Sequence, residues 1–118
     1  MNTPENIIEL AEGEIFVFGS NSGGLHAGGA AAAARARFGA VWGQGEGLQG
    51  RSYAIPTMEG LPALEAAVAR FLVFAAEHPE LTFWVTKIGT GIAGHPIAAI
   101  APLFRERTAN VVVPVEFE

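Results

Sequence analysis

The sequence predicts one α/β domain, in which helices cover both faces of a mostly parallel sheet in a three-layer α/β/α arrangement. Apolar runs of strand length alternate with helical patterns along the chain, and 118 residues that are 50% apolar suffice for one core. The glycines add a third observation, because 10 of the 15 lie between Gly19 and Gly50 and three between Gly89 and Gly94. Glycine gathered in this way marks backbone that turns tightly or approaches another group closely.

The first half of the chain predicts a strand, a helix and a second strand. Glu14–Ser20 is an apolar run rich in β-branched and aromatic residues, which is typical of a buried strand. Ala30–Phe38 starts with five alanines, carries two arginines near its end and stops before Gly39, so we expect a helix. The glycines of Ala40–Gly50 indicate a loop or a loose hairpin, and Ser52–Ile55 reads as the second strand.

The second half repeats the alternation. Leu61–Glu77 has a proline at its start and apolar residues spaced along one helical face, which predicts a helix. Leu81–Ile88 is apolar at nearly every position, as expected for a strand that is covered on both faces. Pro96 to Arg107 predicts a third helix, bent by a proline in its middle. Asn110–Phe117 predicts a last strand, which its proline places toward an edge of the sheet.

Composition excludes several kinds of site. The chain has no Cys and its 12 acidic residues are all Glu, which rules out disulfides, thiolate chemistry, aspartic dyads and EF-hand loops. No closely spaced ligand pair suggests a metal, and we expect no cofactor. The net charge of −5 argues against general attraction to nucleic acid, although a local basic patch stays open. Without a signal-like N-terminus or a long apolar stretch, we expect a cytoplasmic protein outside the membrane.

Three loops leave the ends of the predicted strands: Ser20–Gly29, Pro56–Gly60 and Gly89–His95. Ligands of open parallel sheets bind at this edge. Two of the loops are rich in glycine, and the first opens directly into a helix. Backbone N–H groups at such a place, with the positive end of the helix dipole, bind anions without any basic side chain. We therefore expect a phosphate or diphosphate site, the alternative being that these glycines only permit tight turns.

A further glycine string, Gly45-Glu-Gly47-Leu-Gln-Gly50, matches the spacing of a dinucleotide-binding fingerprint. That motif must follow a strand and open a helix, whereas this one follows a predicted helix and precedes a strand. We therefore interpret it as a return loop.

Several motifs together resemble the macro domains, and in particular a compact bacterial and phage branch of them. They are Ser20-Asn21 after an apolar strand, the run GGLHAGGAAAAARARFG, a strand ending in Ile-Pro-Thr57, and the loop KIGTGIAG. The resemblance extends from Glu14 to Val113. Macro domains bind ADP-ribose, and some hydrolyse ADP-ribosyl linkages. The resemblance therefore implies ADP-ribose, or an ADP-ribosylated macromolecule, as the partner.

By this resemblance, Asn21 meets the distal ribose and the loop Gly89–Gly94 surrounds the diphosphate. The implied ligand-binding residues are Ser20, Asn21, Gly23, Gly24, Gly28, Gly29, Thr57, Gly89, Thr90, Gly91, Ile92, Ala93 and Gly94. Where one hydrolase branch of the family places a catalytic lysine and acid, this chain has Met58 and Ala93. The family's adenine-binding Asp is also absent, so either Glu12 or Glu14 replaces it or the adenine is held in another way. The resemblance thus supports binding more than that chemistry.

His26 lies inside the first glycine-rich loop, where its imidazole could act as an acid or base or contact a phosphate or a ribose hydroxyl. Together with Asn21 it is the candidate catalytic residue if the domain hydrolyses ADP-ribosyl linkages with a positioned water. Ser20 and Ser22 near His26 could suggest nucleophilic catalysis, but the third member would be a Glu that has no local signature. His95 is expected to cap the third helix, the alternative being a contact with the ligand. A third interpretation is a nucleic-acid or protein interaction module on the same fold.

Overall fold

A computed structural model describes residues 1–118 and contains a five-stranded sheet with the order β2-β3-β1-β4-β5. The central strand β1 (Glu14–Ser20) pairs in parallel with β3 (Ser52–Pro56) and β4 (Thr82–Val85). The short β5 (Val111–Val112) runs parallel to β4, and β2 (Gly47–Gln49) runs antiparallel to β3. The expected α/β domain with a mostly parallel sheet is confirmed.

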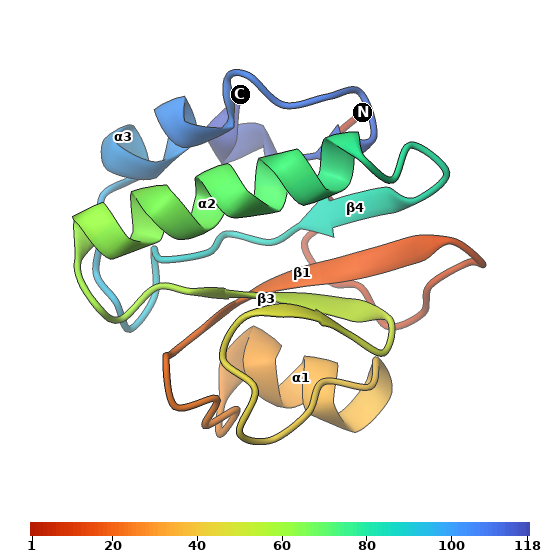
Figure 1. Cartoon of the computed structure of the whole chain (residues 1–118), viewed down its shortest axis with the longest axis horizontal. Helices are drawn as coiled ribbons and strands as arrows, with labels where there is room; N and C mark the ends of the chain where they lie inside the picture. The colour runs from red at the N-terminus through yellow and green to blue at the C-terminus, as the bar shows by residue number, and fades with distance from the viewer.

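Helices lie on both sides of this sheet (Figure 1). The helix α1 (Gly29–Arg37) packs below it in the view of Figure 1, and α2 (Leu61–Ala76) packs above it. The short α3 (Ile97–Ile100) and the 3₁₀ helix η1 (Ala101–Phe104) lie on the same side as α2. The predicted alternation of strands and helices is therefore found in the structure, where helices connect the parallel strands by crossing over the sheet.

Successive side chains of β1 point into two separate clusters, as the period of a strand requires. Ile15 and Val17 belong to a cluster of 17 buried residues on the α2 side. Phe16 and Phe18 join a smaller cluster of six buried residues under α1. The second cluster is small because α1 consists mainly of alanine, and Ala34 is its only fully buried side chain. Short side chains keep the α1 backbone close to the strands.

The elements after β4 are shorter than the sequence predicts. The third helix covers four α-helical residues and then tightens into η1 at Pro102, because proline has no N–H for a bond to Ala98. The last strand is limited to Val111–Val112, since Pro114 cannot donate to the ladder and a 3₁₀ helix η2 (Val115–Phe117) follows. Its expected position at an edge of the sheet is confirmed.

The strand β4 ends at Val85, although the apolar run continues to Ile88. The backbone N–H and the hydroxyl of Thr86 both donate to the Val17 carbonyl, at 3.1 and 2.8 Å. The N–H of Ile88 then donates to the Thr86 carbonyl at 2.7 Å, which closes a tight turn. After this turn the chain enters the second glycine-rich loop, so residues 86–88 do not extend β4.

The glycine-rich segment of residues 40–50 is a loop that ends in β2, and β2 forms an antiparallel hairpin with β3. The Nε2 atom of Gln44 donates to the carbonyls of Glu46 and Leu48, at 3.2 and 3.1 Å. These carbonyls belong to the outer edge of the sheet, so the Gln44 amide covers part of that edge.

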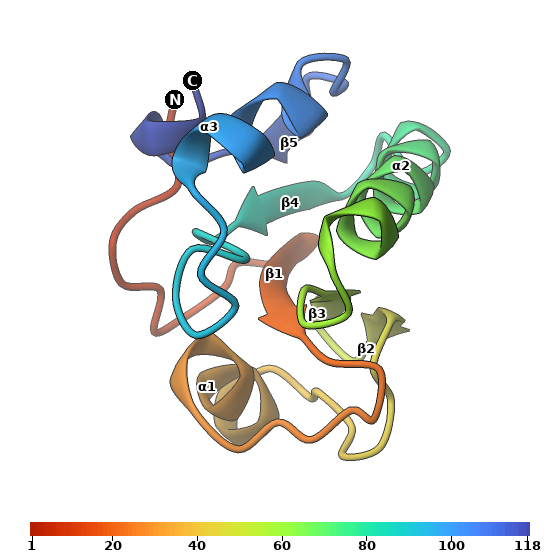
Figure 2. The ribbon, with the colours of Figure 1, turned by 90° about the vertical axis from the view of Figure 1, so that its left-hand side faces the viewer.

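The two chain ends lie close together, because Asn2 Nδ2 donates to Glu118 Oε1 (Figure 2). The Thr3 N–H donates to the Val113 carbonyl at 3.0 Å, and the Thr3 hydroxyl donates to the Val112 carbonyl at 3.0 Å. The N-terminal segment thereby extends alongside the end of β5. None of the helices combines the length and the apolar character needed to cross a bilayer.

Candidate functional site

A cavity of about 550 Å³ opens at the edge where β1, β3 and β4 end. Figure 2 looks onto this edge, with the loop after β4 hanging above α1. The lining comes from the loop after β1, the first turn of α1, the turn after β3 and the loop after β4. Nine of the predicted ligand-binding residues meet here: Ser20, Asn21, Gly28, Gly29, Thr57, Gly89, Gly91, Ile92 and Ala93.

The first wall of the cavity is the start of α1. Its N-cap is Gly28, which has no side chain to bond the first turn, and that turn has no acidic residue. The N–H groups of Gly29, Ala30 and Ala31 donate to no group of the protein. All of these residues line the cavity. The positive end of the helix dipole and a row of free donors therefore face the same space.

The opposite wall is the second glycine-rich loop. The N–H groups of Gly91, Ile92 and Ala93 have no acceptor in the protein. The loop is held by a bond from the His95 N–H to the Gly89 carbonyl at 2.8 Å. Gly89 has a φ of +75°, and an added Cβ would stand 2.8 Å from Ile100 Cδ1, so only glycine fits there. A second row of free donors is thus fixed opposite the first.

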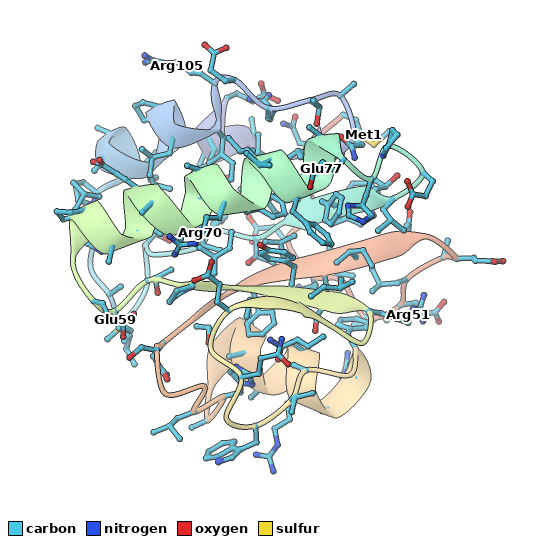
Figure 3. All side chains as sticks on the ribbon, in the orientation of Figure 1. Met1, Arg51, Glu59, Arg70, Glu77 and Arg105 are labelled. Atoms are coloured by element: carbon cyan, nitrogen blue, oxygen red, sulfur yellow. The ribbon has the colours of Figure 1, made fainter.

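Asn21 holds the shape of the first loop. Its Oδ1 accepts the Leu25 N–H at 2.9 Å, and its Nδ2 donates to the Leu25 carbonyl at 3.2 Å. The N–H of Ser22 donates to Glu59 Oε2 at 3.0 Å, which ties this loop to the turn after β3. Figure 3 shows Glu59 at this side of the molecule. Asn21 lines the cavity while both ends of its amide already support the loop.

The turn after β3 is fixed by Thr57. Its N–H and its hydroxyl both donate to the Ser20 carbonyl, at 2.9 and 3.2 Å. The Nε2 atom of His95 lies 3.2 Å from the Thr57 carbonyl. The expected capping role of His95 is wrong, because the N-cap of α3 is Pro96 and no side chain bonds it. His95 instead links the second glycine-rich loop to the end of β3.

Lys87 is the only charged residue that lines the cavity. Its Nζ lies 3.0 Å from Glu116 Oε2 and 3.0 Å from Glu5 Oε1, and these two bonds raise the pKa of Lys87. Lys87 is therefore a stable cation. Met58 and Ala93 line the cavity at the places where the hydrolase branch of the macro domains has its lysine and acid. No Glu or His contributes to the lining, so the cavity offers hydrogen-bond donors and one cation but no carboxylate or imidazole base.

The sequence predicted that His26 faces the ligand, but His26 does not line the cavity. It is 1% exposed, with its Nε2 atom 3.1 Å from Ser20 Oγ and its ring edge-on to Phe18 at a centroid distance of 5.1 Å. Burial lowers the pKa of His26, the Gln44 backbone partly opposes this, and the charge of Arg35 adds to it. The apolar Phe18 attracts the ring into the core, so His26 reaches the cavity only through Ser20.

The remaining predicted ligand residues lie outside the cavity lining: Gly23, Gly24, Thr90 and Gly94. Gly24 packs against residues 43–45, which we call the buttress segment. A Cβ on Gly24 would overlap the Gly43 carbonyl carbon, and one on Gly45 would overlap the Asn21 oxygen. The Gly43 N–H also donates to the Gly24 carbonyl at 2.9 Å. The buttress segment therefore supports the first loop on the side where Gly24 lies.

A second cavity of about 420 Å³ adjoins the first and shares Gly29, Ala30, Thr86 and Lys87 with it. Its other residues come from Thr3–Ile7, from α1 and β1, and from Pro114–Glu116. Glu5 and Glu116 are its carboxylates, whereas neither Glu12 nor Glu14 lines either cavity. The Oε1 atom of Glu14 instead accepts the Ala11 N–H at 2.7 Å. Of the two alternatives for the adenine, replacement of the missing Asp by Glu12 or Glu14 does not fit this geometry.

The chain brings no three His or Glu side chains into a group that could hold a metal ion. The cavities add residues that the motifs did not indicate, chiefly Leu25, Ala27 and Thr86. Leu25 and Ala27 stand next to glycines of the first loop, whereas Thr86 lies inside the apolar run before Gly89 and has no such signal. Comparisons of the chain with protein-family models, with curated proteins and with solved structures found no match to any of them.

Proposed function

We propose that the domain binds ADP-ribose, or a related nucleoside diphosphate, in the cavity at the strand ends, either free or attached to a macromolecule. The observation that carries this proposal is the pair of facing walls in which the N–H groups of Gly29–Ala31 and Gly91–Ala93 have no acceptor. A diphosphate supplies acceptor oxygens and negative charge to both walls at once. The three-layer, macro-like architecture is part of the same proposal, and the helices on both faces of the sheet support it.

The two adjoining cavities favour an elongated ligand. The first turn of α1 and Lys87 belong to both of them, so phosphates at this turn would have room on either side. The distal ribose would lie toward Ser20 and Asn21. The nucleoside would extend toward Glu5 and Glu116, whose carboxylates can accept hydrogen bonds from a base amino group. The larger cavity alone has the volume of an ordinary small-molecule site.

Binding is favoured over hydrolysis by the side chains that line the cavity. A hydrolase needs a group that takes a proton from water, within direct hydrogen-bond reach of it or through one more water. Met58 and Ala93 cannot do this, Lys87 is held protonated, and His26 lies behind Ser20. We therefore place the hydrolase second.

The basic residues do not favour a nucleic-acid module. Arg35 stacks over Trp42 at 4.6 Å, and Arg51 donates to the carbonyls of Leu10 and Ala11. Figure 3 shows Arg51 on the side of the molecule away from Glu59 and the cavity. These cations therefore do not extend the anion site.

Calorimetric titration with ADP-ribose tests the proposal, using Gly91→Glu and its isosteric control Gly91→Gln. A Cβ on Gly91 meets nothing within 4 Å, so both variants should fold. We expect wild type to bind, Gly91→Gln to bind less tightly, and Gly91→Glu to lose binding because its carboxylate repels the diphosphate. Ligand at 100 times its dissociation constant should stabilise wild type by about 2.7 kcal/mol. Absence of heat with millimolar ADP-ribose, or equal affinities of the two variants, would overturn the proposal.

A further inference from the structure

Ser20 and His26 form a buried polar pair at the floor of the cavity. Ser20 is 4% exposed and lines the cavity, whereas His26 is 1% exposed and lies behind it. The distance from Ser20 Oγ to His26 Nε2 is 3.1 Å. The His26 Nδ1 atom is buried without a hydrogen-bond partner. A polar ring in an apolar position, with one nitrogen used only for this serine, calls for a role beyond packing.

The hydrogen of this bond has two possible owners, and the surrounding contacts decide between them. The Ser20 hydroxyl can donate to His26 Nε2 at 3.1 Å or to the Asn21 carbonyl at 3.3 Å. The Asn21 carbonyl already accepts the Gly24 N–H at 2.9 Å. The imidazole nitrogen is therefore the closer and less occupied acceptor. This places the remaining ring hydrogen on Nδ1.

Burial and the charge of Arg35 both disfavour a charged imidazole at His26, and together they outweigh the one group that favours it. The His26 ring packs against Phe18 of β1, which is apolar. The charge of Arg35 in α1 lowers the pKa of His26, because it disfavours a second positive charge nearby. The backbone of Gln44, from the buttress segment, acts in the opposite direction, as an acceptor facing the ring does. A neutral ring with its hydrogen on Nδ1 fits these surroundings.

We propose that His26 is a positioning residue, which takes the Ser20 hydrogen and thereby presents Ser20 Oγ to the cavity as an acceptor only. Such an oxygen accepts a hydrogen bond from a ligand hydroxyl and offers nothing to a phosphate oxygen. The Ser20 subsite therefore selects a sugar hydroxyl, and the free N–H groups of the two walls take the phosphates. This inference rests on the proposed function and assigns the orientation of the ligand within it.

The test compares ADP-ribose with ADP, which has the diphosphate but no distal ribose. In Ser20→Ala we expect affinity for ADP-ribose to fall roughly tenfold while affinity for ADP stays unchanged. Ser22→Ala is the matched control, because the exposed Ser22 hydroxyl makes no hydrogen bond, and it should bind both nucleotides like wild type. His26→Gln should reproduce the selective loss. Equal losses for both nucleotides, or no loss in Ser20→Ala, would overturn the inference.

Two further readouts separate positioning from packing. The preference of wild type for ADP-ribose over ADP should decline at acid pH, because a protonated His26 donates to Ser20 and turns its hydroxyl into a donor. The preference of Ser20→Ala should not change with pH. In the free protein at pH 7.5, ¹⁵N NMR should find the His26 hydrogen on Nδ1.

Finding that hydrogen on Nε2 would overturn the inference without any ligand. If wild type binds neither nucleotide, the proposed function fails first and the selectivity fails with it. Binding of ADP-ribose by wild type with an unselective Ser20→Ala would overturn the Ser20 subsite alone.

Discussion

Two sets of glycines lie around the cavity, and they are present for opposite reasons. At Gly24 and Gly45 two backbone segments of the chain lie so close together that a Cβ on either glycine would overlap the other segment. Gly28 and Gly91 face open space, with nothing within 4 Å of an added Cβ. The first set builds the wall and the second set leaves room in front of it. Composition marks both sets alike, and only the surroundings of the missing side chain distinguish them.

The largest expected effect is that of Gly45→Ala on stability. Its methyl group would overlap the Asn21 oxygen and stand 2.8 Å from the Ser22 carbonyl oxygen, so one of the two loops must move. Overpacking of this kind costs about 3 kcal/mol. Thermal unfolding should therefore show a midpoint lowered by roughly 10 °C.

Gly23→Ala is the matched control for this loss. It adds the same methyl group in the neighbouring loop, where its nearest contacts are at an ordinary 3.6 Å and it does not line the cavity. Gly23→Ala should unfold within about 2 °C of wild type and bind ADP-ribose equally well. A Gly45→Ala protein as stable as Gly23→Ala would remove the distinction between the two sets of glycines.

Gly28→Asp should separate stability from binding. Gly28 is the N-cap of α1 with φ −153° and ψ 169°, a conformation suited to a capping side chain. An aspartate there would bond the free N–H groups of Ala30 or Ala31 and complement the dipole, stabilising the protein by about 1 kcal/mol. The same carboxylate would occupy the anion site, so affinity for ADP-ribose should fall by roughly a hundredfold or more.

The neutral cap Gly28→Asn controls for the charge. Gly28→Asn should stabilise the protein by about 0.5 kcal/mol, and it should weaken ADP-ribose binding less than Gly28→Asp does. Thermal unfolding and calorimetry on the same samples give both quantities. Binding that survives in Gly28→Asp would mean that the ligand does not use the start of α1.

The sequence predicted β1, α1, β3 and α2, together with the edge of the sheet that carries the cavity, because these follow from local pattern, whereas it did not predict the strand β2. Strand β1 and helix α2 have clear periodicity, and the glycines beside Asn21 mark the strand ends. The end of β4 was not predictable from pattern, since the run to Ile88 stays apolar while the turn depends on a bond from Thr86 to Val17. That bond joins residues 69 positions apart.

The candidate site shows the same limit. The motifs indicated nine residues of the cavity, but the burial of His26 depends on Phe18 and on the buttress segment. These groups come from different elements, and a loop histidine in sequence carries no sign of them. The free N–H groups of Gly91–Ala93 likewise follow from loop geometry, which glycine permits without specifying.

The smallest effect that we predict is the contribution of His26 to the free energy of unfolding, and it appears only at acid pH. Burial lowers the pKa of His26 from its usual 6.5, so below that pH the unfolded chain binds a proton that the folded protein does not. The free energy of unfolding should therefore be unaffected by His26 above about pH 7.5 and should fall as the pH drops below 6.5.

Glu116, the other shifted group that titrates in acid, has a pKa lowered from 4.5 by Lys87 and acts only below that value. The interval between pH 6.5 and 4.5 therefore isolates the histidine from this ion pair. Urea unfolding at pH 7.5 and 5.5 should show a larger loss for wild type than for His26→Gln. NMR titration of His26 in the folded wild type should give a pKa below 6.5, and a value at or above it would mean that the ring is solvated and the first loop open.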